Sequence, residues 1–109
     1  MTIPANMNRL DTIEKLEQAI SNSRTHPVLL FKHSVTCGIS ASVFRDVSGS
    51  DAPLNVVIVQ DDREISREIE RRTGIRHESP QAIILHNGEV VYHASHFDIT
   101  ADDIASRLA

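Results

Sequence analysis

The chemistry of this sequence centres on a single thiol. Cys37 is the only cysteine among the 109 residues, so no disulfide can form within the chain. It lies in a polar turn, Ser34-Val35-Thr36-Cys37-Gly38, directly after an apolar run. A free cysteine is often a small buried apolar side chain, but a turn beyond the carboxyl end of a strand is where α/β folds place their sites. We therefore interpret Cys37 as a reactive thiol.

The residues after Cys37 indicate a helix that begins at the thiol. Ile39, Val43 and Val47 recur at four-residue steps and predict one apolar helix face. Unpaired N–H groups and the positive end of the helix dipole stabilise a thiolate at such a position. Ser40 stands where a Cys-x-x-Cys motif has its second cysteine, so an external thiol must resolve any mixed disulfide.

Repeating patterns predict the elements that position this turn. Continuous apolar runs at 28–31 and 54–59 are typical of strands buried on both faces. Asn87-Gly88 predicts a two-residue type I′ hairpin turn, because both of its central positions need a positive φ. The expected elements are a helix from Asp11 to residues 21–23, a strand at 28–31, a helix from Cys37 to Gly49, a strand at 54–59, a helix after Asp62 ending at Gly74, strands at 81–86 and 89–93, and a helix capped by Thr100.

This order predicts an α/β fold of thioredoxin-like type. A central mixed four-stranded sheet is flanked by helices in the order αβαβαββα. Residues 1–8 are expected to be a flexible N-terminus, and residues 9–109 a single domain. In this fold a cis proline faces the cysteine, so we expect Ser79-Pro80 to be cis and to shape a substrate groove. His96 and Lys32 are further candidates for binding substrate or supporting the thiolate.

Composition excludes several other function classes. The formal charge of −4 leaves no basic field for nucleic acid. The apolar runs are too short to span a bilayer, and residues 1–8 lack the apolar core of a signal peptide, so we expect a cytoplasmic protein without membrane contacts. Six histidines are present, but their spacing, including that of His93 and His96, does not indicate a zinc site. No bound metal or cofactor is expected.

Three stretches resemble the monothiol bacilliredoxins, thioredoxin-fold proteins of bacteria that make the low-molecular-weight thiol bacillithiol. They are Phe31-Lys32-His33-Ser34 with Thr36-Cys37-x-Ile39-Ser40, His77-Glu78-Ser79-Pro80-Gln81, and Ser95-His96-Phe97-Asp98-Ile99-Thr100. The resemblance implies that Cys37 removes bacillithiol from S-bacillithiolated client proteins, with bacillithiol as co-substrate. The substrate-binding candidates are Thr36, Gly38, Ser40, Ser79, Pro80, His96 and Lys32. Gly38 departs from the proline that family members commonly carry there.

Two alternatives remain open at this stage. Cys37-Gly38-Ile39-Ser40 is similar to the Cys-Gly-Phe-Ser motif of monothiol glutaredoxins, which carry an iron–sulfur cluster between two subunits. Those proteins usually have a Thr-Val-Pro loop and a Gly-Gly turn, where this chain has Ser79-Pro80 and Asn87-Gly88. The second alternative is a thioredoxin-fold adaptor that binds proteins through the Pro80 loop without redox turnover.

Overall fold

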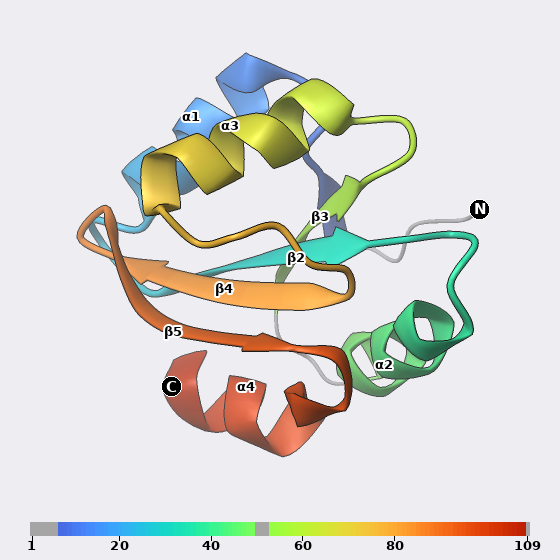
Figure 1. Cartoon of the computed structure of the whole chain (residues 1–109). Helices are drawn as coiled ribbons and strands as arrows, with labels where there is room; N and C mark the ends of the chain where they lie inside the picture. The colour runs from blue at the N-terminus through green and yellow to red at the C-terminus, as the bar shows by residue number, and fades with distance from the viewer. Residues whose placement is uncertain (1–6, 50–52, 109) are drawn as a thin grey trace.

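A computed structural model describes residues 7–49 and 53–108 of the chain (Figure 1). Helices and strands follow the predicted order along the sequence, with one additional strand at the beginning. The elements are β1 (Met7–Arg9), α1 (Ile13–Asn22), β2 (Val28–His33), α2 (Gly38–Ser48), β3 (Leu54–Ile58), α3 (Arg63–Thr73), β4 (Gln81–His86), β5 (Glu89–Ser95), the short 3-10 helix η1 (His96–Asp98) and α4 (Ala101–Leu108).

The sheet has five strands in the order β1-β3-β2-β4-β5, where four were predicted. β1 pairs parallel with β3. The guanidinium of Arg9, the last residue of β1, donates two hydrogen bonds to the Asp62 carboxylate, at 3.0 and 3.2 Å. The prediction of a flexible segment over residues 1–8 is therefore wrong for Met7 and Asn8. Residues 1–6 of that segment lie outside the described part of the chain.

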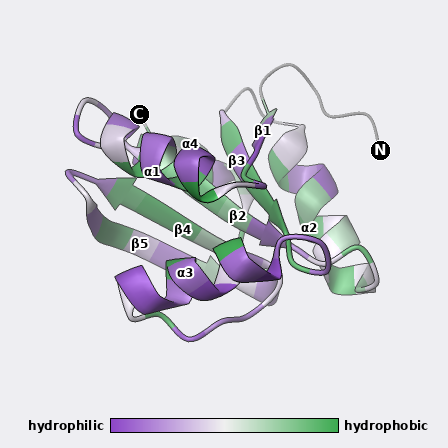
Figure 2. Ribbon diagram, turned by 90° about the horizontal axis from the view of Figure 1, so that it is seen from above, coloured by the Kyte–Doolittle hydropathy of each residue, from purple (hydrophilic) through white to green (hydrophobic). Residues whose placement is uncertain are grey.

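Helices cover both faces of the sheet and divide the core in two (Figure 1). α1 and α3 pack on one face around Leu16, Ile65 and Ile69, whereas α2 and α4 pack on the other around Val43 and Ile104. β2 is buried along its whole length, as predicted for a central strand. Figure 2 shows the central strands mostly green and α3 mostly purple, as expected for an amphipathic helix over a buried sheet.

The hairpin and the last helix form as their sequences predict. Asn87 and Gly88 have φ values of 57° and 76°, as a type I′ turn requires. Thr100 caps α4, because its hydroxyl accepts a hydrogen bond from the Asp103 N–H at 3.2 Å.

Two local predictions are wrong. Thr12 rather than Asp11 caps α1, since Thr12 is extended and its hydroxyl accepts from the Lys15 N–H at 3.1 Å. The Asp11 carboxylate instead pairs with the ammonium of Lys15 at 2.7 Å. Ile39 was expected to share one apolar face of α2 with Val43 and Val47, but it is 38% exposed, whereas those two residues are buried.

The strand pairing brings distant segments to one end of the sheet. β2 and β3 run parallel, so the turns that follow His33 and Ile58 leave the sheet side by side. β4 is antiparallel to β2, with Gln81 opposite Lys32, so the segment before β4 reaches this same end. Gln81 also pairs with Ser95, which brings the end of β5 there. The cysteine turn, the proline segment and the 95–98 segment therefore meet at one end.

Candidate functional site

Cys37 is the N-cap residue of α2, as predicted. Its backbone is extended (φ −105°, ψ 122°), and its carbonyl accepts the helical hydrogen bond from the Ala41 N–H at 3.0 Å. The sulfur makes no capping hydrogen bond, and the residue is half-buried. An N-cap side chain faces the unpaired N–H groups of the first helical turn, which favour a negative charge. The thiol therefore lies half-buried at the N-terminus of α2, where an incoming disulfide can reach it.

Gln60 holds the cysteine turn from the neighbouring strand. It follows β3, and its side-chain Oε1 accepts from the Val35 N–H at 3.2 Å. Its Nε2 donates to the hydroxyls of Ser34 at 2.7 Å and Thr36 at 3.1 Å. Sequence reasoning missed this residue, because a lone glutamine after a strand carries no signal of what it will contact. Thr36, predicted to bind substrate, is thus an exposed residue whose hydroxyl helps to fix the turn.

Ser40 is fully buried and makes two hydrogen bonds. Its Oγ accepts from the Ser34 N–H at 2.9 Å and lies 2.8 Å from Nδ1 of His33. Burial lowers the pKa of His33, which favours the neutral ring beside the Ser40 hydroxyl. The His33 ring also stacks on Phe44, with centroids 4.4 Å apart. A fixed hydroxyl therefore occupies the position where a dithiol protein has its second thiol.

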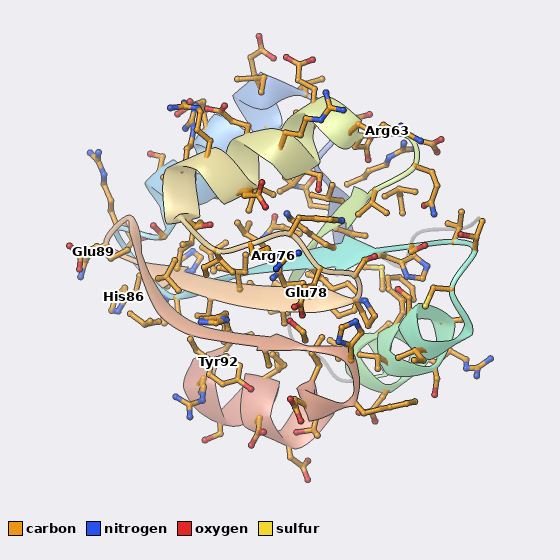
Figure 3. All side chains as sticks on the ribbon, in the orientation of Figure 1. Arg63, Arg76, Glu78, His86, Glu89 and Tyr92 are labelled. Carbon is orange, nitrogen blue, oxygen red and sulfur yellow. The ribbon has the colours of Figure 1, made fainter. Side chains whose placement is uncertain are left out.

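The Ser79-Pro80 bond is cis, as predicted. Pro80 is buried, and its carbonyl accepts from the His96 N–H at 3.0 Å. His96 has a φ of 55°, in the left-handed region, and its exposed ring lies 3.7 Å from the Glu78 carboxylate. Figure 3 labels Glu78 in the segment before β4. The structure thus joins the proline segment to the 96–98 segment, the two candidate regions that sequence analysis proposed separately.

Lys32 does not lie where a substrate-binding residue would. It is 1% exposed, and its ammonium donates to the Ser66 carbonyl at 3.0 Å, with Nδ1 of His77 at 3.2 Å. Successive side chains of a strand point to opposite faces, so Lys32 faces α3 while His33 faces α2. Burial lowers the pKa of Lys32 to about 8. The expectation that Lys32 binds substrate directly is therefore not supported by its position.

The surface around the thiol combines a small residue with exposed apolar side chains. Gly38 begins α2, and a β-carbon built on it meets no atom within 4 Å. Val35 and Ile39, two residues before and after Cys37, are 56% and 38% exposed. Phe97 is 67% exposed on η1, which packs against α2. Exposed apolar groups beside a reactive group are typical of surfaces that bind other molecules.

The described residues offer neither a metal-binding cluster nor a membrane-spanning helix. Within 7–49 and 53–108, no three His, Cys, Asp or Glu side chains come together as a metal-binding group. None of the helices in the same part of the chain has the length and apolar character needed to cross a membrane.

The comparisons with known proteins agree with this geometry. Residues 8–104 match the family model described as monothiol bacilliredoxin BrxC. The chain belongs to the monothiol bacilliredoxin family. A solved structure described as a candidate oxidoreductase with a thioredoxin fold shares 34% identity, covers 93% of this chain and 92% of its own, and superimposes with a TM-score of 0.81. Membership in the bacilliredoxin family supports a thiol redox role for the chain.

More distant structures show the same fold. Thioredoxin from Fasciola hepatica is 15% identical, with a TM-score of 0.71 over 94% of this chain and 96% of its own. A mutant thioredoxin from Halobacterium salinarum is 18% identical, with a TM-score of 0.71 over 100% of this chain and 97% of its own. The predicted thioredoxin-like fold is therefore confirmed, with a fifth strand added to its sheet.

Proposed function

We propose that this protein is a cytoplasmic monothiol thiol-disulfide oxidoreductase that removes bacillithiol from S-bacillithiolated client proteins. One observation carries the proposal. Cys37 caps a helix at the end of a central strand, while the buried hydroxyl of Ser40 occupies the place of a second thiol. A site of this kind can accept a thiol cap but cannot resolve it internally.

The proposed reaction is a thiol–disulfide exchange. The Cys37 thiolate attacks the bacillithiol sulfur of the client's mixed disulfide, so a Cys37–bacillithiol bond forms as the client's S–S bond breaks. The client cysteine leaves as a thiolate and takes up a proton. The disulfide has moved from the client to Cys37, without net oxidation or reduction. A second, external thiol then attacks the bacillithiol sulfur of the cap, forms a disulfide with bacillithiol and releases Cys37 as a thiolate.

The proline segment is the proposed docking edge for the client. Ser79 and Pro80 precede β4 at the same end of the sheet as Cys37, and the backbone of Ser79 can pair with an extended segment as in strand addition. The His96 N–H donates to the Pro80 carbonyl, and the proposed role of His96 is to contact the bound cap or client. Thr36 and Gly38 flank the thiol, and Gly38 leaves open space beside it.

Intact-mass spectrometry tests the proposal directly. Reduced protein is mixed with an S-bacillithiolated client, with the S-glutathionylated form of the same client and with a Cys37→Ser variant as controls. We expect one bacillithiol adduct on the protein, release of the reduced client, a slower reaction with the glutathionylated client, and no reaction of the variant. Absence of an adduct with either mixed disulfide would contradict an oxidoreductase and favour an adaptor or a cluster carrier.

A further inference from the structure

We propose that Lys32 is a positioning residue that holds the Pro80 loop, residues 74–80, in register with the strand that leads to Cys37. This inference rests on the proposed function, because it concerns how the client meets the thiol. Lys32 touches neither the thiol nor an exposed surface, since it is 1% exposed and lies on the α3 face of the sheet. Its effect on the reaction must therefore pass through the groups that it contacts.

The contacts of Lys32 converge on the side chain of His77. The ammonium donates to the Ser66 carbonyl of α3 at 3.0 Å and lies 3.2 Å from Nδ1 of His77. The Ser66 hydroxyl lies at the same distance, 3.2 Å, from that nitrogen. Burial and the charge of Lys32 lower the pKa of His77. Because an ammonium can only donate, Nδ1 of His77 accepts in its contact with Lys32. A strand, a helix and the loop are thus joined at one point.

Other contacts fix the loop, but they reach β2 only through the pairing of β4 with that strand and not through a β2 side chain. The His77 N–H donates to the Glu70 carboxylate, and the Gln81 amide donates to the Arg76 carbonyl at 2.9 Å. The Pro80 carbonyl accepts from the His96 N–H. Figure 3 labels Arg76 and Glu78 on this loop, which runs between α3 and β4. These contacts link the loop to α3, β4 and η1, whereas the Lys32 contact links it to the strand that ends just before the cysteine turn.

Burying the Lys32 ammonium opposes folding, which favours a functional reason for a lysine at this position. Lys32 is among the largest fully buried side chains, and the buried residues of β2, β3 and β4 are otherwise apolar apart from His33 and Gln81. Burying an ammonium is unfavourable even when it is hydrogen-bonded, and an apolar side chain of similar size is often neutral or stabilising there. An unbranched side chain such as methionine would fill the space. Stability alone therefore does not explain the ammonium.

The test compares two reactions of the same thiol in a Lys32→Met variant. Alkylation of Cys37 by iodoacetamide reports the thiol itself, because this small probe needs no docking edge. Removal of bacillithiol from a client protein also needs the Pro80 loop in place. We expect the second-order rate constant with the S-bacillithiolated client to fall about tenfold, since small misplacements of reacting groups cost at least that much. The alkylation rate is expected to stay within about twofold of wild type, and the melting temperature is expected not to fall.

A second variant and a matched control complete the experiment. His77→Leu removes the other end of the contact from an exposed position, so it is expected to fold and to show the same loss. Because both changes break one link, the double variant should be no slower than either single variant. Lys15→Met changes the other lysine of the chain, whose side chain is exposed on α1. This variant should react with the client and with iodoacetamide at the wild-type rates.

The outcomes separate this inference from the proposed function. If wild-type protein removes the cap and Lys32→Met and His77→Leu do so at the same rate, the positioning role is wrong while the function stands. Equal losses in alkylation and client reaction, or independent effects in the double variant, would also overturn it. If wild-type protein takes no bacillithiol from the client, the proposed function itself fails.

Discussion

Replacing Lys32 by methionine should change how the stability of the protein depends on pH. In the folded state burial lowers the pKa of this lysine from its ordinary value of 10.5 to about 8. The unfolded chain has the ordinary value, so between pH 8 and 10.5 the unfolded state binds more protons than the folded state. Stability must therefore rise with pH across this window as Lys32 deprotonates in the fold.

The size of the effect follows from the two pKa values. One pKa unit corresponds to about 1.4 kcal/mol, so the fall from 10.5 to about 8 amounts to roughly 3 kcal/mol. The free energy of unfolding of the wild type, minus that of Lys32→Met, should increase by this amount between about pH 7 and 11. Groups that titrate in both proteins, such as Tyr92, cancel in the difference.

Urea unfolding followed by circular dichroism at a series of pH values measures this difference. Both proteins should carry Cys37→Ser, so that thiol oxidation at high pH does not interfere. Lys15→Met provides the control, because its ammonium is exposed and its variant should show no comparable change. A difference between wild type and Lys32→Met that stays flat from pH 7 to 10.5, or that falls, would refute the argument that Lys32 is buried as a charged group.

Three further substitutions test the cysteine turn. Gln60→Ala removes three hydrogen bonds to the turn and should lower the free energy of unfolding by about 1–3 kcal/mol, measured by urea titration. It should also slow release of the reduced client in single-turnover assays. Ser40→Ala leaves the buried Ser34 N–H and His33 Nδ1 without the Ser40 hydroxyl, so the free energy of unfolding should fall by about 2 kcal/mol. An unchanged urea midpoint would contradict a stabilising role for these two hydrogen bonds. Gly38→Pro places proline at the first helical position with open space around it, and thermal unfolding should show a gain of about 0.5–1 kcal/mol.

The fold was largely predictable because its elements carry strong local patterns. β2 and β3 are continuous apolar runs, and Asn87-Gly88 specifies the turn between β4 and β5. β1 was not predictable in the same way, because Met-Asn-Arg has neither an alternating nor a continuous apolar pattern. It forms because the edge of β3 is open to it and because Arg9 meets Asp62.

The site was predictable where chain order alone determines position. Cys37 and Pro80 follow and precede central strands, so their places result from the topology. Gln60 could not be identified, and the contact between His33 and Ser40 could not be predicted, because these contacts depend on how the chain folds around the turn. For Lys32, the sequence suggested a contact that the fold does not make. Its closeness to Cys37 in sequence suggested a role at the thiol, whereas the alternation of side chains along β2 turns it toward α3.

The central claim is that Cys37 itself takes the bacillithiol cap, and a rapid-quench experiment tests it most directly. Reduced protein in excess is mixed with an S-bacillithiolated client, and acid-quenched samples are analysed by intact mass over time. If Cys37 takes the cap, capped protein and free client thiol should appear at the same rate and in equal amounts. Neither should form with Cys37→Ser. Client release without a matching adduct on Cys37, or release at the same rate by the variant, would contradict the account.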